Sequence, residues 1–96
     1  MKSRFPRVTY RRNAEIYKVL AHPKRLEILN TLYLQDASLE ELTGVLGMPK
    51  PYVSQHLALL RHTRVVNVER KGKCAHYHLV DKRIVYPCKA LKDLWR

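Results

Sequence analysis

The chain has 96 residues, the size of one domain, and 46% of them are hydrophobic, which is typical of a globular protein. Lys and Arg number 19 against 8 Asp and Glu, and this net charge of +11 favours a polyanionic partner, nucleic acid before membrane. The aliphatic runs are too short for a membrane span, and no apolar segment follows the basic N-terminus as in a secretory signal, so we expect a cytoplasmic protein. The two cysteines are too few for a disulfide framework.

The charge is distributed unevenly along the chain. Residues 1–25 carry eight basic residues and one acid, and residues 26–49 carry four acids but no Lys or Arg. Basic residues return from Lys50 onward. We therefore expect the middle segment to face away from a nucleic acid, whose phosphates both flanking segments can approach.

The beginning of the chain is predicted to be a flexible basic arm over residues 1–12, because Pro6 would interrupt a helix there. Residues 13–96 are predicted to form the folded domain. Asn13 is a plausible N-cap for a first helix, because apolar residues then recur at helical spacing, namely Ile16, Val19 and Leu20.

Two further helices are predicted from their end signals. Pro23 fits the first turn of a helix that runs to about Leu34. Ser38 and Glu41 have the spacing of a capping box at the start of the next helix, and Gly47 is placed to end that helix in the left-handed conformation. The buried stripe of this third helix is expected to consist of Leu39, Leu42, Val45 and Leu46.

A fourth helix is predicted to open at Pro51 and to run to about His62. Its buried face is expected to consist of Val53, Leu57 and Leu60. The polar side chains near its start then project from other faces, and these are Tyr52, Ser54, Gln55 and His56.

The last third of the chain is predicted to be a β-hairpin followed by a helix. Residues 65–70 and 74–80 favour strands, and Gly72 lies in the tight turn between them. Asp81 can cap a final helix over residues 82–95, which Pro87 is expected to kink or to delay.

This order of elements is that of a winged helix-turn-helix protein, mainly α with a β-hairpin wing: four helices, two strands and a last helix. An α-helix fits the major groove of DNA and presents its N-terminal residues to base edges, while a basic wing suits phosphate contact. The candidate DNA-binding residues are Lys50, Tyr52, Ser54, Gln55, His56, Arg61, Arg64, Arg70, Lys71 and Lys73.

The sequence resembles the arsenical-resistance repressor (ArsR/SmtB) family of metal- and redox-responsive repressors. The resemblance covers roughly residues 14–95 and is carried by four segments: Val19 to Leu29, Leu39 to Leu42, Val53 to Arg61, and Arg70 to Leu79. It implies a homodimer paired through the first and last helices. In a dimer on double-stranded DNA the two recognition helices should meet successive major grooves about one helical turn apart, so we expect an inverted-repeat operator. The resemblance also implies repression that an inducer relieves, either a thiol or redox signal or a metal ion.

The chain departs from the family pattern in three places. The family usually has Gly after the recognition helix, where Thr63 and Arg64 stand here, so Arg64 must end the helix in another way or contact phosphate. The Cys-x-Cys segment of family metal sensors is replaced by Leu39-Glu40-Glu41-Leu42. A second family metal site is broken, because Asp81 matches its first acid but Arg83 replaces its His.

The remaining sensing candidates are two cysteines and two histidines. One face of the second strand is expected to carry Cys74, His76 and His78, which are ligand types for zinc or copper. We favour a solvated wing face without a metal ion, because neighbours on one strand rarely converge on one ion without a fourth group from elsewhere. Cys74 and Cys88 are candidates for thiol sensing, and Cys88 could pair with Cys74, with its symmetry mate or with nothing. No cofactor is certain, and a thiophilic or transition metal ion stays a candidate inducer.

No catalytic pattern is found, so we do not expect an enzyme. Gly44, Gly47 and Gly72 do not form a phosphate-binding loop, and no Ser, His and acid are spaced as a triad. The alternative function is an architectural or RNA-associated winged-helix module without an inducer, which would bind different DNA fragments alike.

Overall fold

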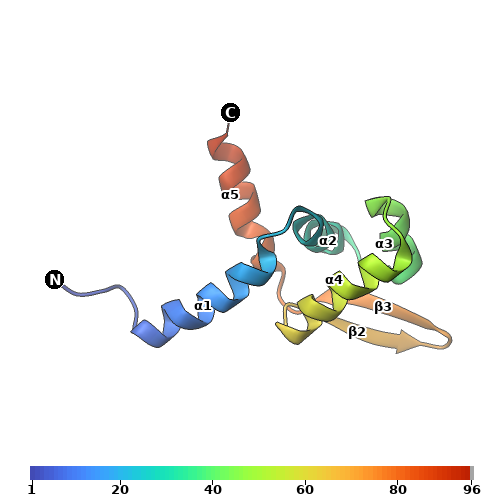
Figure 1. Cartoon of the computed structure of the whole chain (residues 1–96), viewed down its shortest axis with the longest axis horizontal. Coiled ribbons are helices and arrows are strands. Elements are labelled where there is room, and N and C mark those ends of the chain that lie inside the picture. The colour runs from blue at the N-terminus through green and yellow to red at the C-terminus, as the bar shows by residue number, and fades with distance from the viewer. Residues whose placement is uncertain (96) are drawn as a thin grey trace.

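The structure, a computed structural model, describes residues 1–95 and shows a helical body with a β-hairpin that extends from it (Figure 1). Its elements in chain order are α1 (Arg7–Leu20), α2 (Pro23–Leu34), β1 (Ala37–Ser38), α3 (Leu39–Leu46), α4 (Lys50–His62), β2 (Val66–Lys71), β3 (Cys74–Leu79), the 3₁₀ turn η1 (Lys82–Val85) and α5 (Tyr86–Leu94). This order confirms the predicted winged helix-turn-helix, with β1 and η1 as additions.

The core lies where α2, α3 and α4 meet the base of the hairpin. The largest fully buried side chains come from the three helices and from the hairpin, and they include Ile28, Leu32, Leu42, Leu57 and Val66. Burying one such side chain contributes roughly 1.5–3 kcal/mol. These residues fix the rotation of each helix, and therefore which side chains α4 presents to solvent.

The sheet has the strand order β1-β3-β2, with both pairings antiparallel. The hairpin pairs Val66 with Leu79 at its base and Lys71 with Cys74 at its tip. On the other edge of β3, Ala37 lies opposite Tyr77 and is itself buried. The sheet therefore ties the wing to the chain segment that leads directly into α3.

The predicted ends of α3 are confirmed. The Ser38 Oγ accepts a hydrogen bond from the Glu41 backbone N–H at 3.1 Å, and a Glu41 carboxylate oxygen accepts one from the Ser38 N–H at 2.9 Å. These hydrogen bonds hold the pKa of Glu41 below its usual value. Gly47 ends the helix with a φ of 62°. The expectation that Val45 is buried is wrong, because this residue is 56% exposed.

The first helix begins at Arg7 and not after Asn13, so the expectation of a non-helical arm is wrong for residues 7–12. Pro6 lies just before the helix, where its missing N–H costs no helical hydrogen bond. Residues before the helix fold back on Tyr10, whose hydroxyl receives hydrogen bonds from the Ser3 Oγ at 2.7 Å and the Phe5 N–H at 3.1 Å.

The end of the described chain follows the predicted signals. The Asp81 side chain accepts a hydrogen bond from the Arg83 N–H at 2.9 Å and so caps η1. Pro87 lies in the first turn of α5, which starts only at Tyr86, so the regular helix is delayed as expected. Helix α5 stands away from the body in Figure 1, and none of its described residues is buried.

Candidate nucleic-acid interface

The helix-turn-helix consists of α3 and α4, joined by residues 47–49. Helix α4 buries Val53, Leu57 and Leu60 completely, as predicted. Its opposite side is therefore turned to solvent, and Tyr52, Ser54 and Gln55 are exposed in its first turns. These are the positions at which a recognition helix meets base edges.

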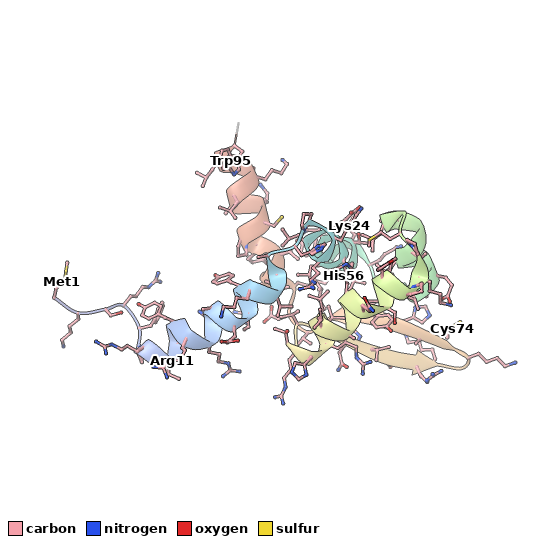
Figure 2. The ribbon with its side chains drawn as sticks, viewed as in Figure 1. Met1, Arg11, Lys24, His56, Cys74 and Trp95 are labelled. Atoms are coloured by element: carbon pink, nitrogen blue, oxygen red, sulfur yellow. The ribbon has the colours of Figure 1, made fainter. Side chains whose placement is uncertain are left out.

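His56 differs from its three neighbours, because it is half-buried and turned toward α2 (Figure 2). Its Nδ1 accepts a hydrogen bond from the Arg25 Nε at 3.1 Å, and its ring lies 4.6 Å from the His22 ring, centroid to centroid. Burial lowers the pKa of His56, and the nearby His22 and Arg25 lower it further. This arrangement favours a role for His56 in holding α4 in place.

Arg25 is a site residue that the sequence pattern did not reveal. Besides its bond to His56, its Nη1 donates to the Val19 carbonyl at 2.9 Å. Arg25 therefore links the end of α1, the start of α2 and the recognition helix. Beside it, the Nδ1 of His22 accepts from the Lys24 N–H at 3.1 Å and caps α2, so His22 has a capping role.

Lys50 opens α4 and is already paired in the free chain. Its Nζ lies 2.9 Å from the Glu40 carboxylate, and both side chains are largely exposed. This contact lowers the pKa of Glu40. An exposed pair of this kind contributes about 0–1 kcal/mol, so Lys50 can exchange Glu40 for a phosphate at little cost.

The C-terminal end of α4 carries Arg61 and Arg64, both exposed. Arg64 adopts the left-handed conformation with a φ of 66°, and its N–H donates to the Arg61 carbonyl at 2.9 Å. An arginine thus takes the backbone conformation that glycine adopts most easily. It ends the helix and still presents a cation at the surface.

The wing is the β2–β3 hairpin, which extends beyond the body (Figure 1). Arg70, Lys71 and Lys73 are exposed around its turn, where Gly72 has a φ of 64°. Three cations on a projecting ribbon can reach a polyanion that lies against α4.

The predicted sensing residues are not brought together. Cys74 lies at the wing tip and α5, which carries Cys88, lies on the other side of the molecule (Figures 1 and 2). A pairing of these two cysteines within one chain, which the sequence left open, is therefore not supported by the fold. Within residues 1–95, no group of three His, Cys, Asp or Glu side chains could hold a metal ion, and this includes Cys74, His76 and His78.

An apolar groove of about 710 Å³ lies between α1, α2, η1 and α5. Cys88 lies in its wall, which is otherwise mainly aliphatic and aromatic and includes Ile16, Tyr17, Leu20, Leu26, Ile84 and Leu91. Among residues 1–95, no helix has the length and apolarity needed to cross a membrane.

Comparison with known proteins places this geometry in a family. Residues 22–68 match the family described as "Bacterial regulatory protein, arsR family". The transcriptional repressor PagR of Bacillus anthracis is 34% identical over 73 residues, which are 75% of this chain and 73% of PagR. The transcriptional regulator KmtR of Mycobacterium tuberculosis is 37% identical over 70 residues, 73% of this chain. The chain spans only about half the length of KmtR, 54%.

Solved structures share the fold. The crystal structure of PagR superposes with a TM-score of 0.78 at 30% identity, over 90% of this chain and 99% of that one. The structure of HlyU from Vibrio cholerae gives a TM-score of 0.82 at 27% identity, over 94% and 98% of the two chains. PagR and KmtR are named as transcriptional regulators, in agreement with the expectation of a regulator and not an enzyme. The chain belongs to the arsR family of bacterial regulatory proteins.

Proposed function

We propose that this chain is a homodimeric transcriptional repressor that binds double-stranded DNA through α4 and the wing. The observation that carries the proposal is the division of α4 into two faces. Val53, Leu57 and Leu60 are completely buried, so Ser54 and Gln55 are held outward in the first turns of a rigidly packed helix. A helix fixed in this way can enter a major groove without reorganising.

The two parts of the interface divide the work of binding. Gln55 can form a bidentate pair with adenine, which contributes about 1–3 kcal/mol of discrimination, and Ser54 and Tyr52 lie beside it. The exposed cations suit phosphate, which sets affinity but not sequence, and these are Lys50, Arg61, Arg64, Arg70, Lys71 and Lys73. His56 is assigned to support, because its ring nitrogen is engaged by Arg25.

The dimer is supported by the apolar groove between α1 and α5. Its wall includes side chains that the isolated chain leaves exposed, such as Tyr17 and Leu91. A second copy related by two-fold symmetry would cover the same groove on both chains. Its two α4 helices would then meet successive major grooves about one helical turn apart, so the operator should be an inverted repeat.

The test selects DNA from a random library with the parent chain and measures affinity for selected and scrambled duplexes over a salt series. We expect Gln55→Ala to relax base preference at one position in each half-site with little change in salt dependence. We expect Lys71→Ala, Lys73→Ala to weaken binding to every sequence and to flatten the salt slope by roughly 0.9 for each phosphate that is no longer neutralised. If Gln55→Ala changes only the salt slope and the wing variant changes base preference, the roles of α4 and the wing are exchanged. If the parent chain binds selected and scrambled duplexes with equal affinity, an architectural module is favoured.

Release of the repressor is proposed to involve the thiol of Cys88. This residue lies half-buried in the wall of the apolar groove, so an oxidised, polar side chain there would disturb the proposed dimer contact. Cys74 is exposed at the wing tip and far from the groove. A metal signal has less support, because residues 1–95 hold no cluster of three candidate ligands.

This release step is tested by measuring DNA binding before and after treatment with hydrogen peroxide. Binding by Cys74→Ser should fall as in the parent, whereas Cys88→Ser should keep its affinity. If the double variant Cys74→Ser, Cys88→Ser responds like the parent, neither thiol is the sensor. If the parent does not respond, the chain has no peroxide switch.

A further inference from the structure

The exposed side of α4 carries a central stripe, defined as Pro51, Gln55 and Ala58. At 3.6 residues per turn, these three positions fall within about 60° of one another on the surface of the helix. All three residues are exposed, and they lie roughly opposite the buried face of α4. The central stripe is therefore the part of α4 that would face the floor of a major groove.

Two of the three residues in the central stripe are apolar. Ala58 ends in a methyl group, and Pro51 has a hydrocarbon ring and no backbone N–H. Neither side chain can donate or accept a hydrogen bond, so neither can recognise a base edge as Gln55 can. The major groove offers an apolar partner in the C5-methyl group of thymine, and alanine is among the side chains that contact it. The chemistry of the central stripe therefore fits thymine.

The spacing of the central stripe also fits stacked bases. Residues three or four positions apart on a helix have their Cβ atoms about 5–6 Å apart. Gln55 comes four positions after Pro51 and three positions before Ala58. Successive bases of a duplex are about 3.4 Å apart along its axis. Each apolar residue would thus lie over a base pair one or two steps from the pair that Gln55 contacts, on opposite sides of it.

The two flanks of the central stripe differ from it. Lys50 and Arg61 lie along one flank, within about 20° of each other, where they suit the phosphates at the groove wall. Tyr52 and Leu59 are 56% and 43% exposed, but they lie on the other flank, beside His56, which is turned toward α2 (Figure 2). Apolar contact with the middle of the groove is therefore assigned to the central stripe.

We propose that Pro51 and Ala58 contact thymine methyl groups on either side of the base pair that Gln55 recognises. This inference rests on the DNA binding proposed above and adds a determinant of sequence to it. Each half-site should contain a thymine, on either strand, within two base pairs of the adenine on each side. Because burying one methyl group changes an equilibrium constant by about 4-fold, each contact is large enough to measure.

The test replaces thymine by deoxyuridine, which lacks the C5-methyl group and keeps the hydrogen-bonding groups of thymine. Each thymine of the selected half-site is replaced in turn, symmetrically in both half-sites, and affinities are measured at one salt concentration. We expect the parent to lose about 15-fold at one position on each side of the adenine, because each duplex loses two methyl contacts of about 4-fold each. The other thymines should be replaceable without loss.

Protein variants assign each loss to a residue. Ala58→Gly removes the side-chain methyl and should bind the thymine and deoxyuridine duplexes equally at one of the two positions, and Pro51→Ser should do so at the other. The matched control is Ala14→Gly, at an exposed alanine of α1 outside the groove wall, which should keep the parent ratio at both positions. Since each result is a ratio of two affinities, the helix destabilisation caused by glycine cancels.

Two results would overturn the proposal. If the parent binds every deoxyuridine duplex as tightly as the thymine duplex, Pro51 and Ala58 are only spacers that let α4 approach the bases. If a loss persists unchanged in both variants, the methyl groups are contacted elsewhere or act through DNA shape. A loss that persists at one position removes only the residue assigned to it. Equal parent affinity for selected and scrambled duplexes is a different failure, because it overturns sequence recognition by α4 before any thymine is replaced.

Discussion

Arg25 holds three helices together through two hydrogen bonds, one to the Val19 carbonyl and one to the His56 ring. Its Nε donates to the Nδ1 of His56, which can accept only while that nitrogen carries no proton. Protonation of His56 would break this bond and add a cation beside Arg25 and His22. The position of the recognition helix is therefore sensitive to the charge on one side chain.

We predict that the free energy of unfolding falls between pH 7.5 and 5.5, and that His56→Gln reduces this fall. Because folding lowers the pKa of His56 below its ordinary value of about 6.5, the unfolded chain binds the proton more readily. The contribution of neutral His56 to stability is therefore complete above about pH 6.5, the pKa in the unfolded chain, and is lost as the pH falls through the lower pKa of the folded state. Urea denaturation at the two pH values measures the change.

The control for this prediction is His62→Gln, an exposed histidine at the end of the same helix. The carboxyls of Glu40 and Glu41 have lowered pKa values, and that of Asp81 is lowered to about 2. All three lose their contributions to stability only at pH values below this window. An identical pH dependence in the parent and His56→Gln would show that another group is responsible.

Arg64 gives a second prediction, on the backbone at the end of α4. A left-handed conformation destabilises a residue with a Cβ by roughly 1–2 kcal/mol. Glycine avoids this strain, but its greater freedom in the unfolded chain destabilises the fold by about 0.5–1 kcal/mol. We therefore expect Arg64→Gly to stabilise the fold by up to about 1 kcal/mol in urea denaturation. Arg64→Ala, which keeps the Cβ, should give no such gain. The strain argument is wrong if the alanine variant is the more stable of the two.

Among the elements, those with local end signals were predicted most closely. Helices α2 to α4 have caps or prolines at their starts. The predicted buried face of α4, Val53, Leu57 and Leu60, is fully buried, so the side of α4 that faces solvent was predicted correctly. Strand β1 was missed, because two residues carry no periodicity and pair only once β3 lies beside them. The support role of His56 was missed because its partner is 31 residues away, which the periodicity of α4 does not reveal.

Ser38 belongs to two elements, and a third prediction concerns this overlap. It caps α3 and also lies opposite His76 in the pairing of β1 with β3. We expect Ser38→Ala to lower the free energy of unfolding by about 1 kcal/mol, as for other caps of this type. The matched change Ser54→Ala, at an exposed helical position, should stay within about 0.5 kcal/mol of the parent. Equal effects of the two variants in urea denaturation would contradict the capping role.

The molecule as a whole places its proposed DNA interface and its apolar groove on different elements. The cations of the proposed DNA interface lie on α4, just after it and on the wing, whereas the apolar groove lies between α1, α2, η1 and α5, with Arg83 and Lys92 in its wall. Helix α5 has no buried residue among those described, and Leu91, Leu94 and the adjacent Trp95 are all more than half exposed. An amphipathic helix with so little to pack against gains little stability from its own chain. The proposed dimer gives this surface a function.

The last prediction tests that dimer through one residue of the groove. Leu91 is 55% exposed in the isolated chain, and a second copy in the groove would bury it. Leu91→Glu would place a charge in that contact, so we expect a monomer in sedimentation at micromolar concentration and weakened binding to the inverted repeat. Leu34→Glu is the matched control, because Leu34 is 80% exposed at the end of α2 and outside the groove wall. It should stay dimeric with parent-like affinity. Sedimentation of Leu91→Glu as a dimer would move the dimer contact away from this groove.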